Sequence, residues 1–167
     1  MATDVGAILR DVGAMKEGHF LLSSGRHGDR YIEKFALLMR PRDAAQVCAL
    51  IAERFADAGV ETVAGPTTGG ILMAFEIARQ MGVRAVYAER ADSGTGREFR
   101  RGATFRPGER VLVDRSGGRV DFGTPLFATY QTDIATYAPD DCPLCREGLP
   151  LVKPGTTVAP GGQTATA

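Results

Sequence analysis

The middle of the chain alternates between long apolar stretches with a helical period and short apolar runs. In residues 41–59, apolar side chains recur at helical spacing between a proline that favours a helix start and a glycine that favours its end. The stretch 71–81 is also long enough for a helix, whereas 61–65 and 83–89 are short runs typical of buried strands. The order helix, strand, helix, strand predicts a right-handed βαβ unit of a parallel sheet.

Outside this unit the pattern changes. Residues 3–15 fit one face of a short helix, and 19–24 and 29–35 flank the turn "GRHG" as two strands outside the βα alternation. The polar segment 90–102 is rich in arginine and glycine, and it predicts a long mobile loop or a β-arm. The run "VLV" at 111–113 predicts a third strand of the sheet.

The C-terminal part of the chain lacks a helical period. From residue 114 to the end we therefore expect no further helix, and 121–137 alternates loosely enough for one or two antiparallel strands. The last residues are rich in proline, glycine and threonine. We predict one domain over 1–155 and a disordered tail over 156–167.

Composition narrows the class of protein. The chain has 167 residues, 44% of them hydrophobic and 24% charged, which is typical of a soluble globular protein. Lys and Arg total 20, as do Asp and Glu, so the chain has no overall basic excess. Its net charge therefore gives no indication that nucleic acid or a membrane surface is a partner. The first residues contain acids and no long apolar run, so we expect no signal peptide and no transmembrane helix. A cytoplasmic enzyme or binding domain is the expectation.

The first candidate site is the loop "PTTGG", which joins the strand 61–65 to the helix 71–81. It places free backbone N–H groups and the positive end of a helix at the carboxyl edge of the sheet, where ligands bind in open α/β folds. Gly69 and Gly70 allow an anion to approach the backbone, and the threonines add hydroxyl donors. The alternative is a plain turn with a threonine cap. It is not a Walker A loop, because no Gly-Lys-Ser/Thr follows.

Two further segments carry candidate chemistry. Arginines and glycines in 90–102 would form a cationic flap that closes over a phosphorylated substrate, although a solvated surface loop is the alternative. In "SSGRHGDRY", Arg26 and His27 could bind a carboxylate, and Tyr31 could stack on a planar ring. The alternative there is a hairpin with a surface histidine.

The chain has three cysteines, an odd number that does not indicate a secreted disulfide framework. Cys142 and Cys145, in "CPLC", have the spacing of one half of a zinc site. The other half is not evident, because Cys48 lies on the buried face of a predicted helix and both histidines are more than a hundred residues away. A four-cysteine site across a dimer axis or a structural turn remains, and we predict no metal ligand within one chain.

Taken in order, several segments resemble one family. "EGHFLLSSGRHGDRYIEKF", "VAGPTTGGILMAFEIARQMGVRAVYAER", "FRRG" and "PGERVLV" resemble orotate phosphoribosyltransferases that carry Thr-Thr-Gly-Gly in the sheet loop. "VLVDRSGG", "VDFGTPLFA" and "DDCPLCREGLPLVKPG" are similar to the C-terminal part of these enzymes. The resemblance runs from about residue 17 to 155. It implies a type I phosphoribosyltransferase-like fold, which is α/β and Rossmann-like, with a parallel sheet, flanking helices and a small hood from the N- and C-terminal segments.

The resemblance also implies a reaction. Such enzymes transfer 5-phosphoribosyl from phosphoribosyl pyrophosphate (PRPP) to N1 of orotate, with Mg²⁺, giving orotidine 5′-monophosphate and pyrophosphate for pyrimidine synthesis. They are homodimers in which a flexible loop of one subunit covers the active site of the other. The alternative from another class is a catalytically silent relative that binds ligands or dimerises.

Site residues follow from matching the motifs. Ser23 and Gly69 stand where many relatives have a lysine, and the usual Lys and His of the mobile loop are not recognisable, so the loop arginines would replace them only loosely. The expected catalytic residues are Arg90 and Arg101, and the expected substrate-binding residues are Tyr31, Thr67, Thr68, Gly69, Gly70 and Arg115.

One family feature is missing from the sequence. Phosphoribosyltransferases carry a strand, two acids and a Thr/Gly loop that binds the 5′-phosphate at a helix N-terminus. Here "PGERVLV" resembles the approach to that signature and "VLVDRSGG" the exit from the next strand, and both use the same "VLV". This predicts that a loop–helix–strand unit of roughly 30 residues is absent. The alternative makes "VLVDRSGG" a degraded signature with Asp114 as its surviving acid.

Overall fold

The computed structural model describes residues 3–114 and 126–155. The chain divides into two compact units, which are described separately: one contains residues 1–12 and 34–131, the other residues 13–33 and 132–167. The expected single domain over 1–155 stays a prediction, and the tail 156–167 lies outside the described residues. No helix in the described ranges is both long enough and apolar enough to span a bilayer.

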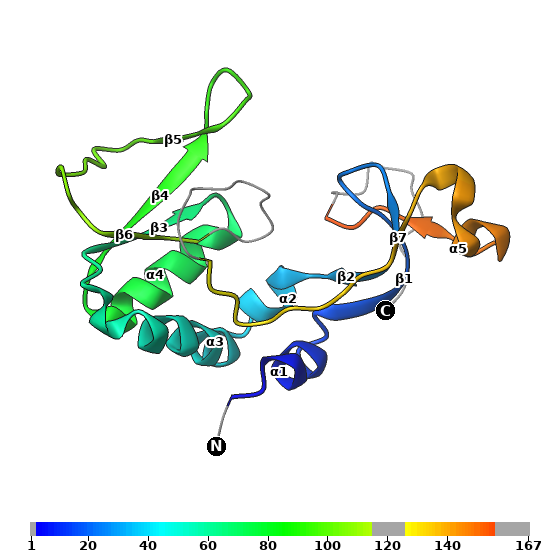
Figure 1. Ribbon diagram of the computed structural model, residues 1–167, viewed down its shortest axis with the longest axis horizontal. Coiled ribbons are helices and arrows are strands. Elements are labelled where there is room, and N and C mark those ends of the chain that lie inside the picture. Colours follow the sequence, from blue (N-terminus) through cyan, green and yellow to red (C-terminus); the bar gives the residue numbers. More distant parts are fainter. Residues whose placement is uncertain (1–2, 115–125, 156–167) are drawn as a thin grey trace. The chain divides into compact units, whose positions relative to one another are not determined.

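The first unit contains the predicted parallel sheet, in the order β5-β4-β3-β6 (Figure 1). Strands β3, β4 and β6 are parallel, and β5 runs antiparallel to β4 as the outer strand of an arm. The three predicted sheet strands and the β-arm are therefore confirmed. Their bounds are Thr62–Pro66 for β3, Arg84–Arg90 for β4, Arg97–Phe99 for β5 and Val111–Val113 for β6.

Two amphipathic helices form the core of this unit with the sheet. Helix α3 (Pro41–Arg54) begins with proline in its first turn, and α4 (Gly69–Met81) packs against α3, β3 and β4. Helix α3 ends earlier than expected, because a short 3₁₀ helix, η1 (Ala56–Ala58), precedes the glycine that closes the segment with positive φ. The buried core residues are Cys48, Val63, Ala74, Ile77 and Ala78.

Two short helices complete the described elements of the first unit. Helix α1 (Val5–Asp11) begins after Asp4, whose carboxylate accepts a hydrogen bond from the Ala7 backbone N–H at 3.0 Å. Helix α2 (Lys34–Leu38) occupies the end of the segment that the sequence assigned to a strand over 29–35. That strand therefore ends sooner than predicted.

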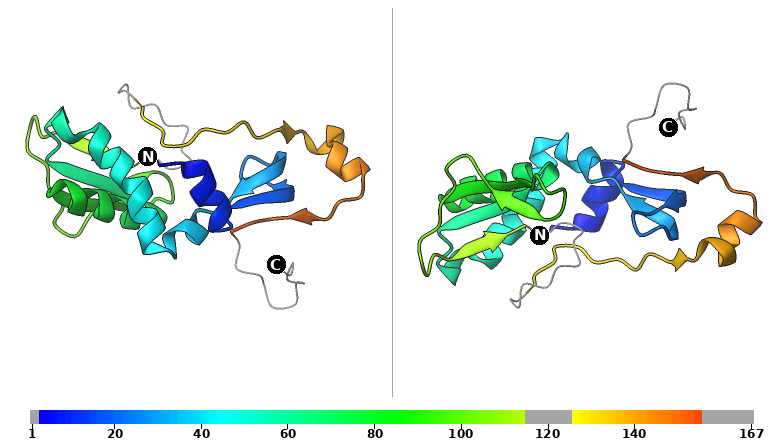
Figure 2. Two further views of the ribbon diagram at one scale, coloured as in Figure 1. Left: turned by 90° about the horizontal axis from the view of Figure 1, so that it is seen from below. Right: turned by 90° about the horizontal axis from the view of Figure 1, so that it is seen from above.

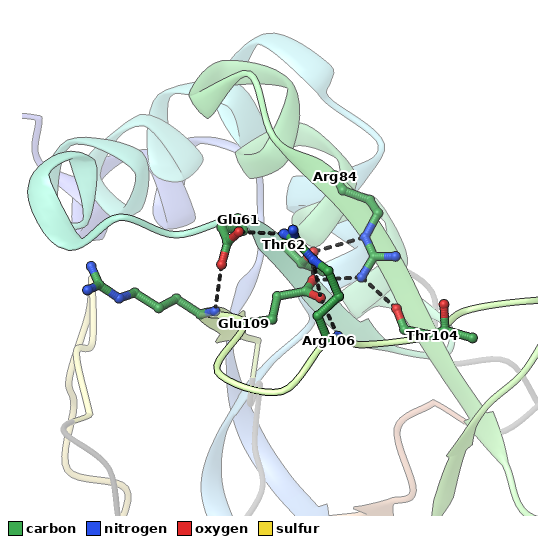
Figure 3. A network of polar contacts seen from close by, with 7 residues as sticks. Glu61, Thr62, Arg84, Thr104, Arg106 and Glu109 are labelled. Atoms are coloured by element: carbon green, nitrogen blue, oxygen red, sulfur yellow. Dashed lines mark hydrogen bonds and ion pairs between the residues drawn. The ribbon is translucent and has the colours of Figure 1, made fainter.

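A polar network ties the amino ends of the parallel strands together (Figure 3). The Thr62 hydroxyl donates to the Glu109 carboxylate at 2.6 Å, and the Arg84 guanidinium donates to the same oxygen at 2.7 Å. The backbone N–H of Arg106 donates to the other carboxylate oxygen at 2.9 Å. Because Glu109 lies in the turn before β6, the network fixes that turn to the starts of β3 and β4.

The second unit is a sheet built from both ends of the chain, in the order β7-β2-β1-β8. Strands β1 (Met15–Leu21) and β2 (His27–Ile32) form the predicted antiparallel pair and lie side by side (Figure 2). Both strands begin and end earlier than the predicted ranges 19–24 and 29–35. Strand β7 (Thr136–Tyr137) pairs with β2 and β8 (Leu151–Val152) pairs with β1. The N- and C-terminal segments thus form one sheet, as the resemblance implied for the hood.

The expectation of no helix after residue 114 is wrong. A 3₁₀ turn, η2 (Pro139–Asp141), leads to one α-helical turn, α5 (Pro143–Arg146). Each begins with a proline, which suits the first helical position. Neither is long enough to show a hydrophobic period, so pattern analysis cannot detect it.

Candidate functional site

The Thr/Gly loop lies where the sequence predicted it, between the carboxyl end of β3 and the start of α4. The Thr67 backbone N–H donates to the carbonyl of Ala88 at 2.9 Å, which fixes the loop to β4. Thr68 is the N-cap residue, and its side chain makes no capping hydrogen bond. Helix α4 therefore presents its first N–H groups and positive dipole end at this edge of the sheet, an arrangement suited to an anion.

Close packing explains two glycines at this loop. A Cβ atom on Gly65 would overlap the backbone of Gly70, and a Cβ atom on Gly70 would overlap the ring of Pro66. Gly70 is also close to the end of β6, since its Cβ position is 2.8 Å from Oδ2 of Asp114. The glycines let the first turn of α4 rest directly on the end of β3.

The structure adds a cation that the sequence analysis missed. A Cβ atom on Gly69 would lie 3.3 Å from Nζ of Lys34, at the start of α2. The resemblance marked Gly69 as a position where relatives carry a lysine, and here an ammonium group from another helix reaches the same place. This contact was missed because residues 29–35 were assigned to a strand. In the structure Lys34 instead begins helix α2.

The arginines of the arm have different partners. The Arg97 guanidinium donates to the Thr67 hydroxyl and so reaches the Thr/Gly loop. Arg90 donates to the carbonyl of Gly94 at 3.3 Å, within the arm. Arg101 makes two hydrogen bonds of 3.1 Å to Glu89, and these bonds raise the pKa of its guanidinium. Arg97, which was not among the expected site residues, therefore joins the arm to the loop, and the catalytic roles of Arg90 and Arg101 stay predictions.

Asp114 directly follows β6 and lies beside the Thr/Gly loop. Its backbone N–H donates to the carbonyl of Ala64 at 2.7 Å, which extends the pairing of β6 with β3 by one residue. Its carboxylate faces Gly70, so one acid does lie at the carboxyl edge of the sheet, as the degraded-signature interpretation requires. Arg115, the expected orotate contact, lies outside the described residues.

The remaining predicted residues belong to the second unit. The Tyr31 ring is half-buried on β2, with its centroid 5.9 Å from that of Phe20, and burial followed by the charge of Glu33 raises the pKa of its hydroxyl. The Arg26 guanidinium donates to the Thr136 hydroxyl and carbonyl at 3.1 and 2.6 Å. His27 is only 6% exposed, so the alternative of a surface histidine is wrong.

The argument that the histidines lie too far along the chain to join the "CPLC" cysteines is also wrong. His19, His27, Cys142 and Cys145 each direct one ligand-type atom into a common cluster, in which these atoms lie within 4.8 Å of one another. The four side chains meet because of the sheet of the second unit. Strand β7 pairs with β2 and β8 pairs with β1, so the segment between β7 and β8, which contains both cysteines, lies beside the hairpin.

The fold and the Thr/Gly loop define a class, the type I phosphoribosyltransferases, and solved structures agree. The crystal structure of orotate phosphoribosyltransferase from Aeropyrum pernix superposes with a TM-score of 0.55 at 27% identity, over 66% of this chain and 63% of that chain. The structure of Leishmania donovani UMP synthase gives a TM-score of 0.54 at 23% identity, over 65% of this chain and 23% of that one. The predicted fold class is confirmed.

Curated relatives define the family. Orotate phosphoribosyltransferase of Pelotomaculum thermopropionicum is 38% identical over 92% of this chain and 96% of its own length. That of Thermotoga maritima is 35% identical over 89% of this chain and 96% of its own length. The chain belongs to the orotate phosphoribosyltransferase family. A scan against models of protein families finds no match.

The length of the alignment bears on the missing signature. The match to the Pelotomaculum enzyme extends over 185 residues, which is more than the 167 residues of this chain. The alignment must therefore include positions at which this chain has no residue. That these positions fall next to "VLV" stays a prediction.

Proposed function

We propose that this chain transfers the 5-phosphoribosyl group from PRPP to N1 of orotate, releasing pyrophosphate, as a step of pyrimidine nucleotide synthesis. The observation that carries the proposal is membership of the orotate phosphoribosyltransferase family, with relatives matched over nearly their whole length. The Thr/Gly loop at the carboxyl edge of the sheet supplies the matching anion site.

In the proposed reaction the loop holds the leaving pyrophosphate. Backbone N–H groups at the start of α4 donate to phosphate oxygens, and the ammonium of Lys34 beside Gly69 adds a positive charge. Arg97 exchanges its bond to Thr67 for the substrate, because a phosphate oxygen is a stronger acceptor than a hydroxyl. These groups lower the barrier by stabilising charge that develops as the bond from the anomeric carbon to pyrophosphate breaks.

We propose Mg²⁺ as the cofactor, bound together with PRPP. Mg²⁺ in such sites takes one or two carboxylates along with substrate phosphates, and Asp114 supplies a carboxylate beside the loop. When bound, Mg²⁺ neutralises part of the pyrophosphate charge. We also propose that the enzyme acts in the cytoplasm as a homodimer.

The test is consumption of orotate, followed by its absorbance, with PRPP and Mg²⁺. We expect turnover that is slow relative to complete family members, because the 5′-phosphate loop is predicted to be absent. Arg97→Ala should lower kcat/KM by about 10- to 100-fold, whereas Arg79→Ala, which removes an exposed arginine at the other end of α4, should change it less than about twofold. Equal effects of the two variants would contradict the role of Arg97.

The alternative is a catalytically silent relative that binds ligands. It is tested because the alignment with the Pelotomaculum enzyme includes positions at which this chain has no residue. Calorimetry with orotate, PRPP and pyrophosphate separates the two functions. Binding of orotate or pyrophosphate without turnover would support the silent relative and refute the proposed enzyme. Turnover at the rate of complete family members would instead refute the claim that the missing segment matters.

A further inference from the structure

The second unit contains a cluster of four side chains that the proposed reaction does not use. His19 lies in β1, and His27 is the first residue of β2. Cys142 is the N-cap residue of α5, and Cys145 lies within that helix. His19, His27 and Cys142 are 3%, 6% and 1% exposed, and Cys145 is exposed. Two imidazoles and two thiols from distant parts of the chain thus form one cluster. The cluster is buried except at Cys145, which solvent reaches.

The spacing of the four ligand atoms is close to that of a tetrahedral zinc site. With Zn–S of about 2.3 Å and Zn–N of about 2.0 Å, tetrahedral geometry places sulfur and nitrogen about 3.5 Å apart. Nε2 of His19 lies 3.5 Å from Sγ of Cys142 and 3.7 Å from Sγ of Cys145, and Nδ1 of His27 lies 3.4 Å from Sγ of Cys145.

The two histidines are slightly closer together than a zinc ion requires. Nε2 of His19 and Nδ1 of His27 are 2.9 Å apart, whereas two nitrogen ligands of zinc would be about 3.3 Å apart. The rings meet edge to face, with centroids 4.8 Å apart, and a small rotation of the His27 ring would provide the difference.

A neighbouring carbonyl orients His19 for this role. Nδ1 of His19 lies 2.8 Å from the carbonyl oxygen of Leu149, and only a protonated Nδ1 can donate there. In the neutral ring, the lone pair then resides on Nε2, which is the atom that faces the two sulfurs. Metal-binding histidines commonly donate their second nitrogen in this way, which fixes the tautomer and the ring plane.

We propose that His19, His27, Cys142 and Cys145 bind one structural zinc ion within a single chain. Binding converts both thiols to thiolates, and their protons pass to solvent. The two thiolate charges balance Zn²⁺, so the buried site has no net charge. A tetrahedral set of two sulfurs and two nitrogens favours zinc over magnesium or calcium, which take oxygen ligands. The exposed side of Cys145 provides the entry path.

A zinc ion would stabilise the second unit, which has a small hydrophobic core. In the described part of the chain, the unit's C-terminal segment forms strand pairs with the hairpin only through the two-residue strands β7 and β8. Among the described residues, its buried apolar side chains are few: Ala14, Phe20 and Cys142. A unit with so small a core generally depends on disulfides or a metal ion, and zinc would join β1 and β2 to α5.

The experiment measures the metal directly. The chain is purified under reducing conditions from zinc-supplemented cells, and its metal content is determined by mass spectrometry; we expect about one zinc per chain. Replacing zinc with Co²⁺ should give the visible d–d bands of tetrahedral cobalt and a near-ultraviolet thiolate charge-transfer band. Reduced protein that holds no zinc and gives no cobalt spectrum would overturn the proposal.

Variants identify the ligands. Cys145→Ser, at the exposed ligand, and His27→Gln should each weaken Co²⁺ binding by more than about 100-fold, the upper range for losing only a partner of a ligand. Cys48→Ala, which removes the cysteine of the first unit, should leave the spectrum unchanged. If His27→Gln keeps the full spectrum and zinc amounts to about half an ion per chain, the site is a four-cysteine site between two chains and our assignment is wrong.

Discussion

At the scale of single residues, Glu109 shows how one carboxylate can connect separate segments. It is 5% exposed and accepts hydrogen bonds from the Thr62 hydroxyl and the Arg106 backbone, with the charge of Arg84 nearby. These contacts, the Thr62 bond foremost, lower the pKa of Glu109 to about 2. An unperturbed glutamate has a pKa of about 4.3.

This shift predicts a pH dependence of stability. Because the pKa is lower in the folded chain, ionised Glu109 stabilises the fold above about pH 4.3, and the contribution is lost as pH falls towards about 2. Glu109→Gln should lower the free energy of unfolding at pH 7 and flatten its fall between these pH values, as measured by urea unfolding. A variant with the wild-type pH profile would contradict the role of the network.

Glu76 provides the comparison for this measurement. Hydrogen bonds from Arg79 and then Gln80 lower the pKa of Glu76 to about 2 as well. Glu76→Gln should therefore flatten the profile independently, and the double variant should be flatter than either single variant. The two sites share no residue, so their effects should add.

At the scale of elements, the contact of α4 with β3 depends on glycine at one position and not at its neighbour. A Cβ atom on Gly70 would overlap the rigid ring of Pro66, whereas on Gly69 it would lie 3.0 Å from Cε of Lys34, a flexible side chain that can move. Both glycines occupy the first turn of α4. They therefore form a matched pair that separates close packing from helix propensity.

Gly70→Ala should destabilise the first unit by about 1–3 kcal/mol, the usual cost of overpacking, and should weaken pyrophosphate binding because the loop must shift. Gly69→Ala should change stability by less than about 1 kcal/mol, since alanine also favours the helix. Urea unfolding of both variants and pyrophosphate calorimetry of Gly70→Ala measure these effects. Equal losses of stability in the two variants would show that Gly70 has no special packing role.

Individual elements of this fold could be predicted from the sequence, but several contacts between elements could not. Helices α3 and α4 and strands β3, β4 and β6 were predictable because each has its own hydrophobic pattern. The Thr/Gly loop followed from chain order alone, since the loop after a parallel strand lies at the carboxyl edge. The contact of Lys34 with the loop was missed because 29–35 was assigned to a strand, whereas Lys34 begins α2. The contact of His19 with Cys142 was not predictable, because β7 and β8, which pair the cysteine segment with the hairpin, are too short to carry a hydrophobic pattern.

At the scale of the whole molecule, the first unit leaves apolar side chains in solvent. Val113, in β6, is 44% exposed, although parallel strands are normally covered on both faces. Leu72 and Phe75, one helical turn apart on α4, are 51% and 63% exposed. Covering such side chains stabilises a folded protein by about 25 cal/mol for each Å² of apolar surface removed from water, which matters because a whole domain is stable by only about 5–15 kcal/mol.

We therefore expect the isolated chain to be marginally stable or to self-associate, and to gain stability when a second copy covers these side chains. The melting temperature should rise with protein concentration, because association stabilises only the folded chain. Sedimentation velocity combined with thermal melts across a concentration series measures both properties. Phe75→Ser should weaken association, whereas Met39→Ser, which removes an exposed side chain in the turn after α2, serves as a control for lost hydrophobicity. A monomer that melts cooperatively above about 60 °C at every concentration would refute this prediction, since most mesophilic domains melt below that temperature.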